Sequence, residues 1–158
     1  MTADNNPPNL PALLAAAGLG RLTPALIPLL AASLRLKASA ADEARLALGA
    51  SKLGGLPDLP AGTPWPGLGG VPLAFVAQVH LDDLRGYPVA QTLPRAGWLH
   101  FFYDARQQAF GDKPADRGAW QVLYAPGSAP NGLKRQAAPE ALPAESRFKA
   151  AAVDWARS

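Results

Sequence analysis

Two histidines, His80 and His100, are the side chains best suited to acid–base or metal chemistry in this sequence. Each occupies an alternate position of an apolar run, VAQVH and WLHFF. If these runs pair as strands, both imidazoles can lie on one face, where Asp82 or Asp104 could supply a carboxylate ligand. The spacing lacks the HxxxH or HExxH pattern, however, and favours structural histidines within a sheet. We therefore predict no metal and no other cofactor.

Nucleophilic catalysis is equally poorly supported by the sequence. The chain has no cysteine, and no serine stands in a GxSxG motif. The neighbouring carboxylates of Asp82 and Asp83 point in different directions in any regular backbone, so they favour capping of a short helical turn over a glycosidase pair. The glycine pairs at 54–55 and 69–70 lack phosphate-binding motifs and predict turns. The sequence assigns no catalytic residue and favours binding over catalysis.

Composition and charge limit the class of partner. Of 158 residues, 49% are hydrophobic and 17% are charged, which is typical of a folded domain. The net charge is only +3, and Lys134-Arg135 is the sole adjacent basic pair, so there is no basic stripe for nucleic acid. The start of the chain lacks a signal-peptide pattern, and prolines interrupt the short apolar run 22–34. We expect a cytoplasmic protein that binds neither nucleic acid nor membrane.

The elements that must position these side chains begin with helices. Residues 1–9 predict a flexible polar tail, Pro11 predicts the first turn of a helix, and Thr23 before Pro24 predicts the N-cap of a second helix. Period-two alternation then predicts four strands, at 33–39, 71–81, 98–104 and 120–126.

The strand at 98–104 carries large rings on both faces, which predicts a central position in a sheet. Residues 147–158 fit either a helical stripe or an extended strand. The order of elements predicts an α+β fold, in which N-terminal helices precede a mainly antiparallel sheet within one domain over residues 10–158.

A proline- and glycine-rich stretch, SKLGGLPDLPAGTPWP at 51–66, separates the first strand from the others. Residues that precede proline are biased toward extended backbone, and prolines lower the entropy of the unfolded chain. Leu53, Leu56 and Leu59 recur at the spacing of a polyproline II helix, and Trp65 follows them. We predict a stiff extended wrap that closes the edge or bottom of the sheet with Trp65 as a plug. The alternative is a binding platform.

Four segments together, SKLGGLPDLPAGTPWP, PLAFVAQVHLDDL, LPRAGWLHFFYD and DKPADRGAWQVLYAP, resemble the YwqG-like family of bacterial proteins in order and spacing. The resemblance is best over residues 33–126, with RFKAAAVDWARS as a possible further strand. It implies a mainly antiparallel α+β domain and no catalytic residue. Family members are longer, with a second half that carries a His-Gln-type motif, so the resemblance implies a shortened form. Some relatives lie beside polymorphic toxins, which implies an immunity role.

These features favour a non-enzymatic protein-interaction domain, an immunity or accessory protein that acts on a partner protein such as a toxin. Tryptophan and tyrosine are enriched at interfaces, and we assign Trp98 and Phe102 to the core. The candidate contact residues are His100, Asp104, Asp116, Arg117 and Trp120.

The alternative function is a small-ligand-binding protein or an unrecognised enzyme. Its pocket would lie between the extended wrap and the sheet, with Trp65 nearby and with Gln78, His80 and Arg117 as polar groups. In either case we expect a monomer or a weak homo-oligomer.

Overall fold

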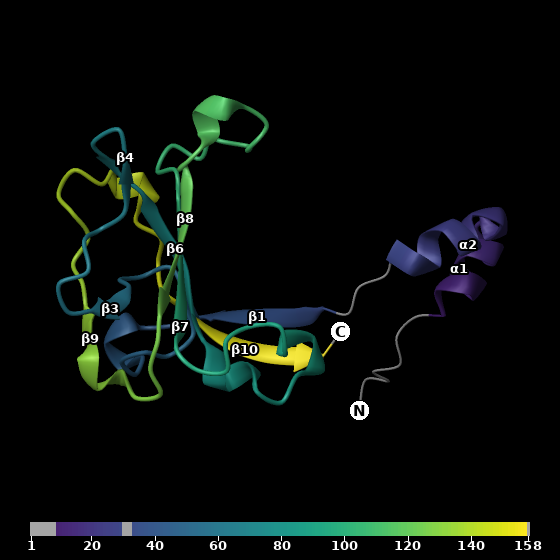
Figure 1. The fold of residues 1–158 in the computed structure, drawn as a ribbon, viewed down its shortest axis with the longest axis horizontal. Coiled ribbons are helices and arrows are strands. Elements are labelled where there is room, and N and C mark those ends of the chain that lie inside the picture. Colours follow the sequence, from purple (N-terminus) through teal and green to yellow (C-terminus); the bar gives the residue numbers. More distant parts are fainter. Residues whose placement is uncertain (1–8, 30–32, 158) are drawn as a thin grey trace. The chain divides into compact units, whose positions relative to one another are not determined.

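A computed structural model of the chain describes residues 9–29 and 33–157 (Figure 1). Of the predicted polar tail, residues 1–8 lie outside the described residues. Contacts divide the chain into one unit that ends at Arg35 and includes the last residues from Ala156, and a second unit, Leu36–Trp155. No helix of the described part is long and apolar enough to cross a bilayer.

The first unit contains two short helices, α1 (Leu10–Ala16) and α2 (Thr23–Leu26), with the 3-10 turns η1 (Gly20–Leu22) and η2 (Ile27–Leu29) beside α2. The Asn9 side chain accepts a hydrogen bond from the N–H of Ala12 at 3.3 Å, and proline stands in the first turn of α1, as predicted. Thr23 is not an N-cap, because η1 leads directly into α2 and Thr23 already has helical dihedrals.

A six-stranded sheet with the order β1-β10-β2-β6-β7-β8 forms most of the second unit. Its strands are β1 (Leu34–Ala40), β2 (Lys52–Leu53), β6 (Ala74–His80), β7 (Trp98–Tyr103), β8 (Trp120–Ala125) and β10 (Ala151–Arg157). The pairs β10–β2, β2–β6, β6–β7 and β7–β8 are antiparallel. The predicted α+β fold with a mainly antiparallel sheet is confirmed.

Smaller elements surround this sheet. Two antiparallel ribbons pair β3 (Asp58–Pro60) with β9 (Leu133–Arg135) and β4 (Gly67–Leu68) with β5 (Val71–Pro72). The remaining elements are the 3-10 turns η3 (Glu43–Arg45), η4 (Leu81–Leu84), η5 (Pro88–Ala90), η6 (Pro114–Asp116), η7 (Pro130–Gly132) and η8 (Ala144–Ser146). Asp82 and Asp83 lie inside η4, whose N-cap is His80, so neither carboxylate is the cap residue.

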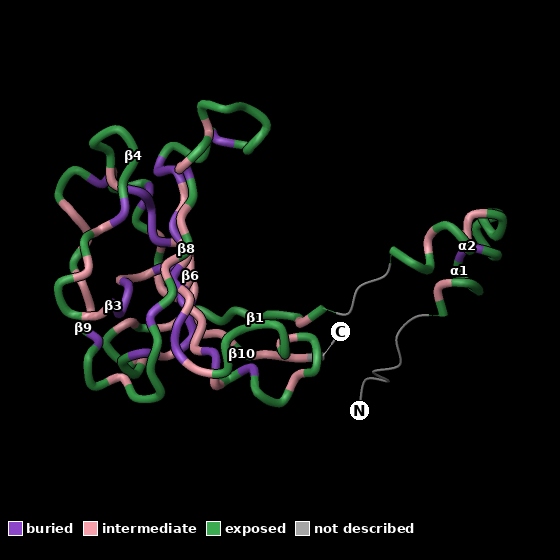
Figure 2. Tube along the Cα trace, viewed as in Figure 1, coloured by how far each residue is buried: buried purple, intermediate pink, exposed green. Residues whose placement is uncertain are grey.

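The two faces of the sheet differ in burial, because buried and half-buried residues alternate along β7. Figure 2 shows where the buried residues fall along the chain. One face forms the core, where Trp98 and Phe102 of β7 are each 2% exposed, as predicted. Phe75 of β6 and Leu59 of β3 pack in the same core cluster as Phe102. As predicted, β7 is an inner strand, since it pairs with β6 on one side and β8 on the other.

The stretch 51–66 is extended over β2 and β3, as predicted, but left-handed glycines at 54, 55 and 62 turn the chain after each of these strands. Its position differs from the prediction, because Lys52 and Leu53 pair with both β10 and β6 inside the sheet instead of closing an edge. The remainder contributes to the core face, where the ring of Trp65 lies 5.5 Å from that of Phe102 in an edge-on contact. The wrap is thus both a sheet strand and a cover.

Candidate functional site

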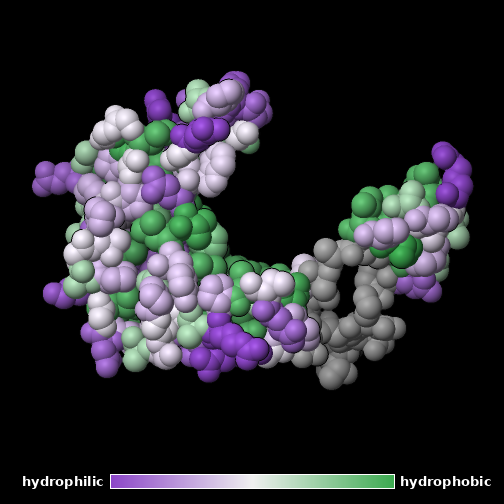
Figure 3. Space-filling view, viewed as in Figure 1, coloured by the Kyte–Doolittle hydropathy of each residue, from purple (hydrophilic) through white to green (hydrophobic). Residues whose placement is uncertain are grey.

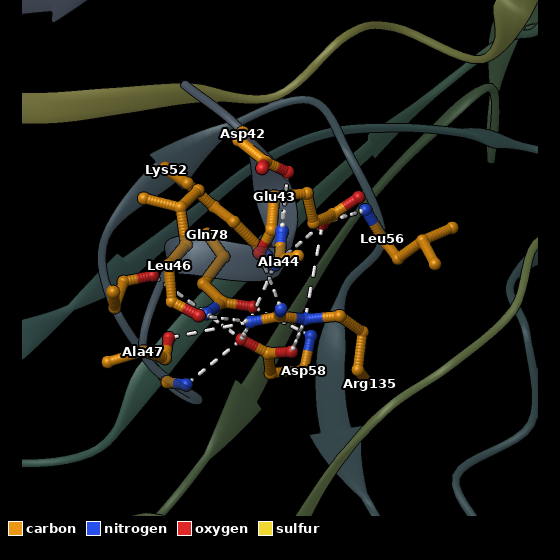
Figure 4. A network of polar contacts seen from close by, with 12 residues as sticks. Asp42, Glu43, Ala44, Leu46, Ala47, Lys52, Leu56, Asp58, Gln78 and Arg135 are labelled. Atoms are coloured by element: carbon orange, nitrogen blue, oxygen red, sulfur yellow. Dashed lines mark hydrogen bonds and ion pairs between the residues drawn. The ribbon is translucent and has the colours of Figure 1, made fainter.

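A buried polar network of the second unit is centred on the Asp58 carboxylate of β3, which accepts four hydrogen bonds (Figure 4). Arg135 of β9 donates from Nε to Oδ1 at 2.8 Å and from Nη2 to Oδ2 at 3.3 Å. Gly49 donates its N–H at 2.9 Å, and Gln78 donates from Nε2 at 3.0 Å. Asp58 is 0% exposed, so these donors replace its hydration completely.

A second cation, Lys52 of β2, is also 0% exposed. Its Nζ lies 3.4 Å from Oδ2 of Asp58 and 3.2 Å from Oε1 of Glu43. Glu43 also accepts the N–H of Leu56 at 2.7 Å, which ties η3 to the extended wrap. The network therefore balances two carboxylates with two cations, Lys52 and Arg135, as buried charges require.

The network continues onto the central strands through Gln78 and His100, which lie opposite each other in the β6–β7 register. Oε1 of Gln78 accepts the N–H of Asp58 at 2.8 Å, and Nε2 donates to the carbonyl of Ala50 at 2.8 Å. Nε2 of His100 lies 2.8 Å from the Asp58 carbonyl, so it carries the proton. These bonds hold the wrap onto the sheet.

The charge state of Asp58 follows from its partners. Burial alone would raise its pKa, but hydrogen bonds from Arg135, Gln78 and Gly49 hold that pKa below the ordinary 3.8. The carboxylate is therefore ionised at neutral pH. Because neither Asp58 nor Lys52 has an exposed surface, this pair positions the chain and is closed to a substrate.

We expect the free energy of unfolding to fall as the pH drops below 6.5. Burial lowers the pKa of His100 below 6.5, although the hydrogen bond to the Asp58 carbonyl opposes this shift. As the pH falls, His100 therefore takes up a proton in the unfolded chain before it does so in the folded chain, which favours unfolding. Below pH 3.8, Asp58 becomes protonated in the unfolded chain before it does so in the folded chain, so the free energy of unfolding falls further. One group contributes a slope of at most about 1.4 kcal/mol per pH unit. Urea unfolding at a series of pH values measures both slopes.

His100→Gln is the matched variant, since its amide can still donate to the Asp58 carbonyl. In this variant the free energy of unfolding should change less between about pH 7 and 5, whereas the decrease below pH 3.8, which comes from Asp58, should remain. A curve as steep as that of the unchanged protein would contradict the role given to His100.

A second cluster, not anticipated from the sequence, joins Ser51, His80 and Asp83. Oγ of Ser51 donates to Asp83 at 2.6 Å and accepts the His80 N–H at 2.9 Å. Nδ1 of His80 lies 3.5 Å from Asp83, and its ring stacks on Trp98 at 4.8 Å. The serine hydroxyl donates to the Asp83 carboxylate and not to the imidazole, so the arrangement differs from a Ser-His-Asp triad, in which the histidine accepts the serine proton. The sequence contains one local indication of this cluster, the i,i+3 spacing of His80 and Asp83.

The candidate residues after β7 organise a loop. Oδ1 and Oδ2 of Asp104 accept the N–H groups of Arg106 and Gln108 at 3.3 and 3.1 Å. Burial would raise the pKa of Asp104, but these bonds and the charge of Arg106 hold it below 3.8. Asp116 accepts the N–H of Gly111 at 2.9 Å, and Arg117 beside it is exposed. These two aspartates therefore shape the loop between β7 and β8.

The structure does not gather the sequence-predicted residues into one site. Gln78 and His100 belong to the buried network, and His80 lies on the same face in the second cluster. The indole N–H of Trp65 donates to the Leu73 carbonyl at 2.9 Å, whereas Trp120 is 49% exposed on β8. Within residues 9–29 and 33–157, no group of three or more histidine or acidic side chains could hold a metal ion.

The second face of the sheet, called the open face here, carries no fully buried side chain on β7 or β8. Trp120, Val122 and Tyr124 of β8 are 49, 51 and 48% exposed. They stand opposite half-buried residues of β7, namely Tyr103, Phe101 and Leu99. This apolar, aromatic surface continues along the edge strand β8.

The fold and these sites define an α+β domain with an antiparallel sheet, a buried polar network and an exposed aromatic edge. The family described as Domain of unknown function (DUF1963) matches residues 51–157, and the chain belongs to this family. The matched range runs from β2 to β10 and includes Asp58, Gln78, His100 and Arg135. A comparison with curated proteins gives no match.

Proposed function

We propose that this domain binds a partner protein by adding an extended segment of the partner to β8. The observation that carries the proposal is the character of this edge strand. β8 ends the sheet order and, among the described residues, pairs only with β7. Natural edge strands usually carry charges or proline that block pairing, whereas β8, WQVLYA, has neither. Such an edge suits strand addition, in which main-chain hydrogen bonds supply much of the affinity.

The open face supplies side-chain contacts for such a partner. Hydrophobic residues gather where β6, β7 and β8 run (Figure 3). Trp120 and Tyr124 belong to the residue types that dominate binding energy at protein interfaces. Arg117, predicted as a contact from the sequence, is exposed in the loop that leads into β8 and can contribute to a polar rim.

Val122→Lys should weaken partner binding while leaving the fold intact. Val122 is at the middle of β8 and 51% exposed, so lysine can extend into solvent in the free protein but places a charge against any added strand. We expect at least about a tenfold loss of affinity, equivalent to about 1.4 kcal/mol. Affinity capture with the tagged protein, in lysate of its source and with products of adjacent genes, identifies the partner for titration.

The matched control is Val71→Lys, at a valine that is 39% exposed on β5, a strand of the separate β4–β5 ribbon. It should bind the partner as the unchanged protein does. Equal binding by the two lysine variants, or full binding by Val122→Lys, would remove β8 from the interface.

An immunity or accessory role in the cytoplasm is the specific form of this proposal. It rests on the YwqG-like resemblance and on the position of some relatives beside toxins. A toxin from an adjacent gene is therefore the first partner to test. Co-expression should restore growth with the unchanged domain and not with Val122→Lys, and restored growth with both would argue against toxin binding through β8.

A further inference from the structure

A cavity of about 330 Å³ lies between the extended wrap and the segment that precedes β10. Its apolar wall is formed by Leu56 and Trp65 of the wrap, Phe75 of the sheet, and Leu142 and Phe148. Phe75 faces the core side of β6, so this cavity is separate from the open face. Its volume is at the lower end of the range for small-molecule sites, and it suits a ligand with one ring or a short hydrocarbon chain.

The polar residues of the cavity differ in how far their bonding capacity is used. Ser146 donates its hydroxyl to the Ala105 carbonyl at 2.6 Å. Glu43 lies 3.2 Å from Lys52 and 4.0 Å from Arg135, so its charge is already compensated. Neither residue supplies an uncompensated charge for a ligand.

Arg147 supplies that charge. Arg147 is an exposed residue that lines the cavity, and its Nε and Nη2 donate to the carbonyls of Pro139, Glu140 and Leu142 at 2.8–3.2 Å, which fixes the guanidinium. These bonds leave Nη1 without a protein acceptor among the described residues. In the same described part of the chain, Arg147 takes part in no ion pair. The cavity thus combines an apolar wall with one positioned, uncompensated cation.

We propose that this cavity binds a small hydrophobic carboxylate, with the hydrocarbon part against Trp65 and Phe75 and the carboxylate on Arg147. A planar guanidinium matches a carboxylate through charge-assisted hydrogen bonds, which are about twice as strong as neutral ones. The polar groups expected from the sequence for a pocket in this region, Gln78, His80 and Arg117, do not line the cavity. This site is independent of partner binding through β8.

Three probes of one shape test the proposal: 3-phenylpropionate, 3-phenylpropionamide and 3-phenylpropylamine. Each is titrated into the full chain and followed by NMR on the indole N–H of Trp65, assigned with a Trp65→Phe variant. We expect the carboxylate to bind about tenfold more tightly than the amide, and the amine more weakly than both. Arg147→Gln should remove the carboxylate preference and leave amide binding unchanged, with the other indole signals in place as evidence of folding.

Other outcomes overturn the proposal. Equal binding of carboxylate and amide by the unchanged protein, or no binding of either, would exclude an anion site. A carboxylate preference that survives in Arg147→Gln would place the cation elsewhere. Loss of both probes in that variant would assign Arg147 to support of the 139–142 loop. None of these results bears on Val122→Lys, so failure here and failure of the β8 proposal are distinguishable.

Discussion

Asp58→Asn should lower the free energy of unfolding by about 3–5 kcal/mol. The carboxylate is fully buried and accepts hydrogen bonds from Arg135, Gln78 and Gly49. Asparagine has nearly the same shape, but it would leave Lys52 and Arg135 with one carboxylate between them. Its amide would also turn an N–H donor toward groups that are themselves donors. The large effect follows from removing one member of a buried set of charges, since the others stay desolvated.

Urea unfolding at neutral pH measures this loss, and Asp42→Asn is its control. Asp42 lies one residue before Glu43, but its side chain is 62% exposed and its ion pair with Arg45 is at the surface. Exposed pairs of this kind contribute little, so the control should change stability only slightly. If the two asparagine variants were equally stable, the network would not be the main polar support of the fold.

The strands were predictable because their signals are local. Alternation over five to seven residues correctly gave β1, β6, β7 and β8, and large rings on both faces of residues 98–104 correctly gave an inner strand. Residues 147–158 were ambiguous, and the structure shows β10, so the helical alternative is wrong. The alanines of this segment fit the periodicity of a helix and that of a strand equally well. The segment is a strand because Ala151 and Ala152 pair with β2, about a hundred residues earlier in the chain.

The buried network could not be predicted in this way. Asp58 and Arg135 are 77 residues apart and meet only because β3 pairs with β9, within a segment that the sequence presents as loop. The sequence predicts Gln78 and His100 as binding groups because they interrupt apolar strands. These two polar residues are tolerated in buried strands because the wrap covers them and its Asp58 backbone is their hydrogen-bond partner. A polar residue in a buried strand indicates a polar partner, but the sequence does not say whether that partner is a ligand or the chain itself.

Gly54→Ala should destabilise the domain by about 2–4 kcal/mol, because two separate costs combine at this position. Gly54 has φ +58°, a left-handed conformation that a side chain disfavours. A Cβ built there would also lie 2.4 Å from the backbone carbonyl oxygen of Lys149. That oxygen belongs to the main chain just before β10, so the clash cannot be relieved by rotating a side chain. Relief would instead shift the chain where Gly55 donates its N–H to Phe148 at 2.9 Å.

Gly69→Ala separates the two costs. Gly69 has the same φ of +58°, but nothing lies within 4 Å of the added Cβ, so this variant should lose only about 1 kcal/mol from backbone strain. Thermal and urea unfolding of both variants therefore give the clash as a difference of about 1–3 kcal/mol. If the free energy of unfolding fell equally in the two variants, the main chain near Lys149 would be able to move away from the new methyl group at no measurable cost. A larger loss for Gly54→Ala would show that the glycine after β2 permits the close approach by which the wrap enters the sheet beside β10.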